Sequence, residues 1–388
     1  MKKIILASGA ALMLTMGAAE AQDKTLTISV YAFAQDEFKE LVYTPFEQKC
    51  GCKLVVETGN SVERLAKMEA NKANPVVDLA IVSMADALSA TRKDLIQKID
   101  ATKVPNIENL YDIAKDPNGD GMSVGVNFYA TSIVYRTDKM KIDSWADLLK
   151  DGIVDHVAFP NVTTNQGPPA LYMLGKAIGK DTPDLSGAIE AVGEKKDDIV
   201  TFYEKSSQLV QLMQQEEIWA APIGRFTWAP FSKLDMPIAW ATPKEGQTGG
   251  MNVMIVTKNS KNRDLALEFI DFWLSADIQS KLAEALIDSP SNKEAKVSEA
   301  AAKNLTYGDE TAKSLKLIPS AVSLDNSAGW LKRWNGKVGQ EARALRLGQV
   351  GCPSPSPSPL LRGNGTSHTQ ALSEKKLTRH PPYLCTRG

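Results

Sequence analysis

Residues 26–58, LTISVYAFAQDEFKELVYTPFEQKCGCKLVVET, contain the signals of a strand, a helix and a second strand in succession. The first residues, LTISVYAF, and the last ones, CKLVVET, are rich in β-branched and aromatic side chains, which is typical of strands. The segment 36–49 between them has apolar side chains at the spacing of one helix face, namely Phe38, Leu41, Val42 and Phe46. This order predicts two parallel strands connected by a helix.

The alternation of strands and helices continues to residue 286. Further strands are predicted at 77–83, 124–136, 156–160, 218–224, 238–243 and 249–258. Helices are predicted at 61–71 and 84–94, in the residues that follow 160, and as one periodic segment at 262–286. Because the pattern restarts near residue 124, the sequence predicts two α/β units of comparable size, each a mostly parallel sheet flanked by helices.

The residues that follow the predicted strands share a composition of small hydroxyls, amides, glycines and aromatics. They are YAFAQ (31–35), TGNSVE (58–63), SMAD (83–86), NFYAT (127–131), PNVTTNQG (160–167) and IGRFTWA (223–229). Ligands of doubly wound sheets lie beyond the carboxyl ends of the strands. This composition is suited to holding a small polar molecule and not to breaking a bond.

Catalytic and metal-binding motifs are not found. The sequence contains no G-x-S-x-G and no H-E-x-x-H, and GKAIGKD at 175–181 lacks the spacing of a phosphate-binding loop. His156 lies in a predicted strand, where a packed or surface histidine is favoured; a secreted α/β hydrolase, the alternative of another class, would need a serine beside it. DPNGDG at 116–121 matches the start of a calcium loop, but the closing position falls on Asn127, and a turn explains it equally well. We therefore predict no enzyme, catalytic residue, metal site or cofactor.

The charge and the first residues indicate an exported protein with no nucleic-acid partner. The formal net charge is -1, and acidic and basic residues are interspersed. Lys2 and Lys3 precede an apolar run over 4–16 and an A-x-A site at 19–21, the pattern of a secretory signal peptide. We expect cleavage after Ala21 and a periplasmic location. No later segment is apolar enough to span a membrane.

Export makes disulfides possible, and the chain has four cysteines. Cys50 and Cys52 flank Gly51, which is interpreted as the C-cap of the preceding helix. A bridge between them would close a tight ring, so two free thiols are favoured over a disulfide. The other two cysteines lie in residues 341–388, where Pro-Ser repeats without apolar periodicity predict a disordered or non-native tail; a basic partner-binding tail is the alternative.

Taken in order, several segments resemble a known family over roughly residues 24–335. They are LTISVYAF, FEQKCGCKLVVETG, NPVVDLAIVS, YDIAKDPNGDGMSVGVNFYATSIVYR, SWADLL, TPKEGQTGGMNVMIVTKNSKN and LALEFIDFWLSADIQSKLAEA. The chain resembles the extracellular solute-binding proteins of ABC importers, and within them the cluster of polyamine, 4-aminobutyrate, thiamine and ferric-ion binders. The resemblance implies a two-lobed type II fold whose ligand cleft lies between the lobes.

The resemblance also implies lobe limits and a mechanism. The first lobe is expected at 22–127 plus 251–300 and the second at 128–250 plus 301–340, with hinge strands near Asn127 and Gly250. A ligand that contacts both lobes favours the closed state, and the membrane permease reads the closure. The expected partners are a small solute and the permease subunits of an importer, and the protein is expected to be a monomer.

Candidate ligand contacts in the first part of the chain follow the strands. They are Tyr31, Phe33, Asn60, Ser61, Ser83, Asn127 and Tyr129. Four of them have an alternative. Phe33 also suits a strand-face core position, Asn60 and Ser61 suit a plain helix cap with Glu63 in capping-box position, and Ser83 has the same ambiguity.

The remaining candidates indicate the kind of ligand. They are Thr163, Thr164, Asn165, Gly167, Arg225, Trp228, Glu245 and Asn252. The loop 159–169 suits a helix start that offers hydroxyls and free N–H groups to an anion, with a plain cap as the alternative. Arg225 offers a planar fork to a carboxylate, with a surface salt bridge as the alternative, and Trp228 offers a ring for stacking.

The absence of acidic residues at two candidate positions is evidence against a polyamine ligand. Polyamine binders of the family have acidic residues in the cleft. Where their sequences resemble MDS, with an aspartate, this chain has Asn252 in GGMNVM, and it has no acid in residues 159–169. The adjacent tyrosine pair of the iron binders is not visible either. We therefore predict a carboxylate-bearing or zwitterionic solute, such as a 4-aminobutyrate-like compound, with Arg225 on the negative end and Glu245 or an aromatic on the positive end. A polyamine or a thiamine-like cation is the alternative.

Overall fold

The computed structural model describes residues 24–339. The predicted signal peptide and the tail 341–388, with Cys352 and Cys385, lie outside the described residues. The strands are β1 Thr25–Val30, β2 Lys53–Thr58, β3 Leu79–Ser83, β4 Ile96–Gln97, β5 Ser123–Arg136, β6 Ala158–Pro160, β7 Thr201–Tyr203, β8 Ala220–Gly224, β9 Ile238–Trp240 and β10 Thr248–Thr257.

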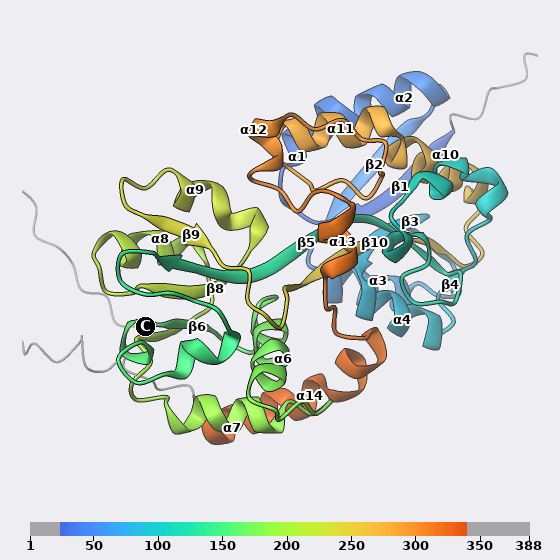
Figure 1. Ribbon diagram of the computed structural model, residues 1–388. Coiled ribbons are helices and arrows are strands. Elements are labelled where there is room, and N and C mark those ends of the chain that lie inside the picture. Colours follow the sequence, from blue (N-terminus) through green and yellow to red (C-terminus); the bar gives the residue numbers. More distant parts are fainter. Residues whose placement is uncertain (1–23, 340–388) are drawn as a thin grey trace, which may run out of the picture. The chain divides into compact units, whose positions relative to one another are not determined.

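Helices alternate with these strands (Figure 1). They are α1 Gln35–Phe38, α2 Thr44–Cys50, α3 Ser61–Ala70, α4 Met84–Arg92, α5 Asp112–Lys115, α6 Gly167–Ala177, α7 Ser186–Glu194, α8 Ser207–Gln214, α9 Trp228–Ser232, α10 Arg263–Leu274, α11 Ala276–Glu284, α12 Glu299–Ala302, α13 Asp309–Ser314 and α14 Ser320–Lys337. A π-helical turn, η1, covers Lys39–Tyr43, and 3₁₀ turns are η2 Ala101–Lys103, η3 Pro105–Asn109, η4 Trp145–Leu149, η5 Val154–His156 and η6 Arg225–Thr227. No helix among residues 24–339 has the length and hydropathy to cross a membrane.

The main sheet has the strand order β2-β1-β3-β10-β5-β8, with β4 paired to β10 and β9 to β5. The parallel pairing of β1 and β2 that residues 26–58 predict is confirmed, from Thr25 opposite Lys53 to Val30 opposite Thr58. All pairs that β5 and β10 make are antiparallel, so the main sheet is mixed where mostly parallel strands were expected. A separate sheet pairs β6 with β7 in parallel. The predicted α/β class is confirmed.

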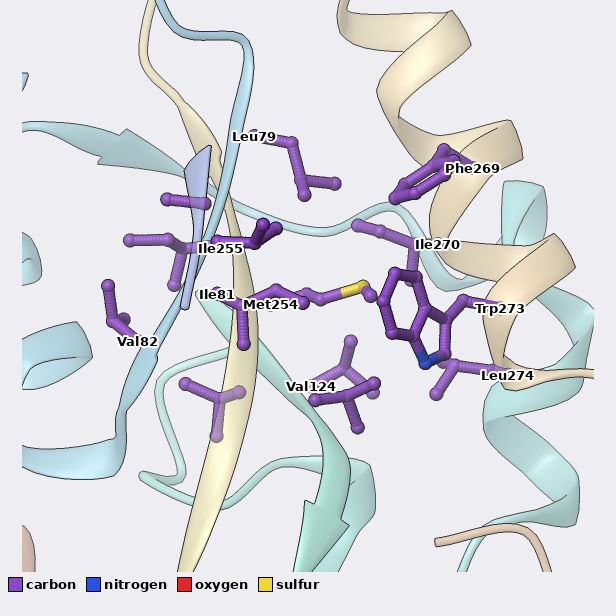
Figure 2. Close-up of a cluster of buried hydrophobic side chains, with 14 of the residues drawn as sticks. Leu79, Ile81, Val82, Val124, Met254, Ile255, Phe269, Ile270, Trp273 and Leu274 are labelled. Atoms are coloured by element: carbon purple, nitrogen blue, oxygen red, sulfur yellow. The ribbon is translucent and has the colours of Figure 1, made fainter. Parts of the chain in front are cut away.

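The two largest groups of buried side chains flank the long strands β5 and β10. The first cluster draws on residues 26–130, 251–282 and 312–315. In it, Met254 of β10 points at Trp273 and Ile270 of α10 (Figure 2). The second cluster draws on residues 133–241 and 330–338. Strand β5 contributes to both clusters, so it passes from one packing unit into the other; the lobe limits expected from the sequence stay a prediction.

Two predicted helices are interrupted for local reasons. The segment 36–49 is helical throughout but contains the π turn η1 just before α2, where Pro45 lies in the first turn. Proline lacks an N–H and clashes with the carbonyl four residues earlier, and a wider turn relieves this clash. The segment 262–286 is not one helix: Ser275 has extended dihedral angles (φ -63°, ψ 147°) and its hydroxyl caps α11.

Cys50 and Cys52 form a disulfide, so the preference for free thiols was wrong. The reason is the backbone of Gly51, which caps α2 as predicted in the left-handed conformation (φ 60°, ψ 37°). This turn folds the chain back and brings the two Cα atoms to 5.2 Å, within the range that a disulfide spans.

The disulfide is expected to contribute little stability, because it closes a loop of very few residues. The chain-entropy relation gives about 1.5 kcal/mol for such a loop. Replacing both Cys50 and Cys52 by serine should lower the free energy of unfolding by about that amount, measured by guanidinium denaturation without ligand. A loss above about 3 kcal/mol would show that the bridge supports more of the fold than its own turn.

Candidate functional site

A carboxylate that sequence reasoning did not single out lies at the centre of a polar network. Asp288 follows α11 and accepts hydrogen bonds from the Tyr31 hydroxyl (3.2 Å) and from Asn127 Nδ2 (2.6 Å). Tyr31 directly follows β1, and Asn127 lies in β5. Three segments that are far apart in the sequence thus meet at one acid.

The electrostatics of Asp288 are those of an acid without a counter-ion. Burial raises its pKa to about 6, although the hydrogen bonds from Asn127 and Tyr31 act in the opposite direction. Among the described residues, no lysine, arginine or histidine forms an ion pair with it or contributes to that shift. At neutral pH the carboxylate is ionised and lacks a cation, and such buried groups are concentrated at functional sites.

The network continues from Asp288 along the β5–β10 pair. Asn252 Nδ2 donates to Asn127 Oδ1 at 2.9 Å, and the two residues are opposite each other in the strand register. Asn127, 4% exposed, thus donates to Asp288 with its amide nitrogen and accepts from Asn252 with its amide oxygen. Both candidates from the sequence therefore lie in one cluster with Tyr31.

A second polar group joins the N-termini of α3 and α4. The hydroxyls of Ser61 and Ser83 both donate to Asp86 Oδ2, at 2.6 and 2.8 Å. Asn60 forms the predicted capping box with Glu63, and Ser83 caps α4. The cap roles given as alternatives for Asn60 and Ser83 are thus confirmed, and whether these residues also contact a ligand stays a prediction.

Arg64 of α3 is a buried cation that sequence reasoning missed. Its side chain donates to the Gly59 carbonyl, its Nε has no partner among the described residues, and the residue is 5% exposed. Burial lowers its pKa, while Tyr31, Asp86 and Glu63 raise it. It was hidden in the sequence because it belongs to an ordinary amphipathic helix.

Arg225 lies against two tryptophans. Its guanidinium carbon lies 5.0 Å from the ring centre of Trp228 in α9 and 4.7 Å from that of Trp240 in β9. One terminal nitrogen donates to the Lys303 carbonyl, and the buried Nε has no partner among the described residues. The expected salt-bridge alternative is wrong within residues 24–339, because no acid pairs with Arg225 there. Burial lowers its pKa to about 10, so it stays charged at neutral pH.

Trp240 was not among the predicted site residues. The only signal for it was its place in the strand-like segment 238–243, where it is the last residue of β9. Its indole nitrogen donates to Gln247 Oε1 at 2.8 Å, which fixes the ring beside Arg225. The ring of Trp228, which was predicted, meets that of Trp240 edge to face at 6.0 Å.

Other predicted residues are engaged locally. The carboxylate of Glu245 accepts from the Ser144 hydroxyl (2.6 Å) and from the Trp145 backbone (3.2 Å), which ties it to the start of η4. Tyr129 meets the Phe226 ring edge to face at 5.1 Å, and burial raises its pKa to about 12.

The loop before α6 is held by bonds of its own. Thr163 and Thr164 bond to Asn161, and the Thr164 hydroxyl also accepts from the Gly167 backbone N–H. Helix α6 begins at Gly167 with proline in its first turn, as predicted. A side chain at Gly167 would meet the Asn161 carbonyl at 2.2 Å, so close packing requires the glycine. Asn165 is exposed in this loop. Thr163 and Thr164 form their bonds within the turn before α6, and the N-cap residue Gln166 makes no side-chain cap bond, so the plain-cap alternative is not found here. Contact of Thr163 and Thr164 with ligand stays a prediction.

Large apolar side chains are exposed beside these polar groups. Phe33 is 62% exposed, Val62 69%, Phe226 55% and Leu286 43%. Each lies within two residues of a site residue, namely Tyr31, Ser61, Arg225 and Asp288 in turn. Phe33 is therefore not a core residue, and exposed apolar groups beside polar ones are typical of surfaces that a ligand or a closing partner covers.

The remaining motifs carry no chemistry at this site. His156 lies in η5 and not in a strand, and its ring stacks on Trp219 with centres 3.3 Å apart. Asp116 and Asp120 accept backbone N–H groups of their own turn. Among residues 24–339 no group of three or more His, Cys, Asp or Glu is arranged to hold a metal. A cavity of about 150 Å³ lies elsewhere, lined by Met68, Lys72, Asp94, Leu95, Thr257, Lys258 and Asn259.

Comparisons with known proteins give the family. The family model of bacterial extracellular solute-binding proteins matches residues 42–307. The spermidine/putrescine-binding periplasmic protein of Escherichia coli is 27% identical over 350 residues, which cover 86% of this chain and 93% of that protein. The putrescine-binding periplasmic protein PotF of the same species is 24% identical over 316 residues, 75% of this chain and 84% of that one.

A solved structure supports the same family assignment. An ABC transporter protein from Clostridium perfringens matches with a TM-score of 0.75 and 32% identity, covering 81% of this chain and 99% of that chain. The expected fold, transport role and non-enzymatic character are therefore confirmed, and the family is extracellular or periplasmic. The chain belongs to the bacterial extracellular solute-binding proteins, which deliver small molecules to the permease subunits of ABC importers.

Proposed function

We propose that this protein captures a small solute that carries both an ammonium group and a carboxylate, such as 4-aminobutyrate or a related ω-amino acid. The observation that supports this most is a pair of unmatched charges: Asp288 has no cation partner, and Arg225 has no anion partner, among the described residues. A zwitterion supplies both missing charges. The ammonium would bind Asp288, and the carboxylate would bind Arg225.

One segment connects the two charged groups. The Thr306 backbone N–H donates to the Ser289 hydroxyl, next to Asp288. Three residues before Thr306, the Lys303 carbonyl accepts from Arg225. A short chain path thus leads from the acid to the arginine, which supports a shared site for one elongated ligand.

Capture is coupled to closure in the proposed mechanism. Arg225 follows β8, and β8 contributes Ile223 to a third cluster of buried side chains, which draws on residues 134–231 and includes Phe231. Asp288 instead belongs with the first cluster through Tyr31. A ligand that bridges them favours the closed arrangement of the proposed lobes. Shifting such a hinge from 1:99 to 99:1 requires a differential affinity of about 5.5 kcal/mol, which two charge-assisted contacts and an aromatic one can supply.

A polyamine is the second candidate, because the relatives at 24–27% identity are named as putrescine- or spermidine-binding proteins. Asp288 would serve one ammonium of a diamine equally well, and the rings of Trp228 and Trp240 suit stacking on a cation. Against this candidate, Arg225 and the buried Arg64 would repel a second ammonium placed near them.

The experiment is a binding panel on the full chain after unfolding and refolding to remove any co-purified solute. Melting temperature and calorimetric affinity are measured with 4-aminobutyrate, common amino acids, putrescine, spermidine and thiamine at pH 7.5. We expect the zwitterion to raise the melting temperature by mass action. Binding of putrescine or spermidine without any zwitterion would overturn the ω-amino acid assignment in favour of a polyamine, and turnover of any compound would contradict a pure binding role.

A further inference from the structure

Asn252 lies at the end of a directional chain of side-chain hydrogen bonds. Its Nδ2 donates to Asn127 Oδ1 (2.9 Å), Asn127 Nδ2 donates to Asp288 Oδ1 (2.6 Å), and the Tyr31 hydroxyl donates to Asp288 Oδ2 (3.2 Å). No bond in this chain joins Asn252 to Asp288 directly. Asn252 therefore influences the acid through Asn127.

The amide of Asn127 has two orientations, and only one of them suits a charged carboxylate. With its NH₂ toward Asp288 it stabilises the ionised acid, and with its oxygen there it would repel the same acid. Donation from Asn252 requires the Asn127 oxygen on the far side, which leaves the NH₂ facing Asp288. As a donor, Asn252 thus favours the orientation that suits the ionised acid.

The backbone holds this arrangement at an irregular point of the sheet. Asn252 and Asn127 pair across β10 and β5, and the register shifts between Asn252 and Val253. Bulges of this kind redirect side chains and are common beside binding sites. Asn127 also forms an isolated antiparallel bridge with Pro290, two residues after Asp288, which fixes the acid's segment against β5.

We propose that Asn252 is a positioning residue, which holds the Asn127 amide so that Asp288 remains ionised and ready for the ammonium group of the ligand. The part that concerns the ligand rests on the proposed function, whereas the effect on Asp288 does not. Polyamine binders resemble MDS at this position, with an aspartate in place of Asn252. An acid at position 252 would add a second negative charge beside Asp288, whereas Asn252 supports the negative charge of Asp288 through Asn127.

The groups that face Asp288 are few. Tyr31 donates from the end of β1, Tyr43 of η1 interacts with it electrostatically, and Arg64 of α3 interacts with Tyr31. Burial raises the pKa of Asp288 to about 6, and the hydrogen bond from Asn127 lowers it. Loss of that bond should therefore raise the pKa further.

The test compares Asn252→Leu, which removes the donor, with Asn252→Gln, which keeps an amide. The Asp288 carboxyl is titrated by carbon NMR in the ligand-free full chain, with its signal assigned by its loss in Asp288→Asn. We expect the titration midpoint in Asn252→Leu to rise by roughly 1 unit, the size of a lost charge-assisted hydrogen bond, and the midpoint in Asn252→Gln to stay closer to that of the wild type. Asn304→Leu is the matched control, because the Asn304 amide donates to the Ala300 carbonyl and not into this chain.

Binding provides the second readout. The pH dependence of the affinity for 4-aminobutyrate and for putrescine should move upward by the same amount as the NMR midpoint in Asn252→Leu. An unmoved midpoint in Asn252→Leu, or an affinity that falls equally at every pH, would overturn the positioning role. If neither compound binds the wild type, the proposed ligand fails while the NMR titration still decides the role of Asn252. Should Asn252→Leu not fold, Asn252→Ala tests the same point, because alanine has no donor for Asn127 and adds no charge.

Discussion

Replacing Asp288 by asparagine should strongly weaken amine binding and at the same time stabilise the ligand-free protein at neutral pH. Removing one partner of a buried, hydrogen-bonded charge pair costs roughly 2–5 kcal/mol of binding energy, which is about 30-fold or more in affinity. The substitution keeps the size of the side chain and an oxygen that accepts from Asn127 Nδ2. Calorimetric titration with 4-aminobutyrate and putrescine measures the loss.

The gain in stability follows from the pKa of Asp288, which rises from 3.8 to about 6 on folding. Between these values the folded chain binds more protons than the unfolded chain, so wild-type stability falls as the pH rises through this window. Above pH 6 the full cost of the buried charge remains. The difference of about 2.2 units, at 1.36 kcal/mol each, sets an upper limit of about 3 kcal/mol on the gain in Asp288→Asn at pH 7.5.

Denaturant unfolding at pH 4 and pH 7.5 measures whether Asp288→Asn gains stability, and at which pH. The stability difference between Asp288→Asn and the wild type should be small at pH 4 and favour the variant at pH 7.5. Asp277→Asn is the control, since Asp277 is exposed in α11 and pairs with Lys281; such surface pairs contribute about 0.5 kcal/mol or less. A variant that binds amines like the wild type, or that is equally destabilised at both pH values, would contradict the role given to Asp288.

Replacing Arg225 by methionine should separate the two ligand classes. Methionine keeps a long apolar side chain against Trp228 and Trp240 but removes the charge. We expect the affinity for 4-aminobutyrate to fall by about 10- to 150-fold, the range of a charge-assisted hydrogen bond of 1.5–3 kcal/mol. The affinity for putrescine should stay the same or increase, because a repulsive charge is removed. Arg225→Lys should recover part of the loss, since it keeps the charge but not the planar fork.

Calorimetry at pH 7.5 in fixed salt measures both ligands on the same preparations. Arg92→Met is the control, because Arg92 is an exposed residue of α4 that pairs with Asp325. An equal loss for both ligands in Arg225→Met would mean that Arg225 acts through its bond to the Lys303 carbonyl and not through the ligand's carboxylate.

Much of the local structure was predictable because it depends on neighbours in the sequence. The β1–β2 pairing, the Gly51 cap, the Asn60–Glu63 capping box and the start of α6 were all predicted and are present. Two of the errors were also local, whereas the antiparallel pairing of β5 and β10 depends on strands far apart in the chain. The conformation of Gly51 allows the disulfide, and Ser275 ends one helix and caps the next.

The centre of the candidate site was not predictable in this way. Asp288 lies in ALIDSPSN, which follows a helix and not a strand, so a search of strand ends passes it by. Its partners Tyr31 and Asn127 are 257 and 161 residues away in the chain. The argument that the cleft lacks acids rested on positions 159–169 and 252 alone, and it did not consider Asp288, which the structure places beside Tyr31 and Asn127.

The sequence by itself determined the order of strands and helices, the α/β class, the family and several strand-end residues, since hydrophobic period, caps and turns are set by residues a few positions apart. Only the tertiary structure decided which charges lack partners. An ion pair or an orphaned charge depends on the side chains that packing brings together, and no local pattern indicates that Asp288 has no cation beside it or that Arg225 has two tryptophans and no acid.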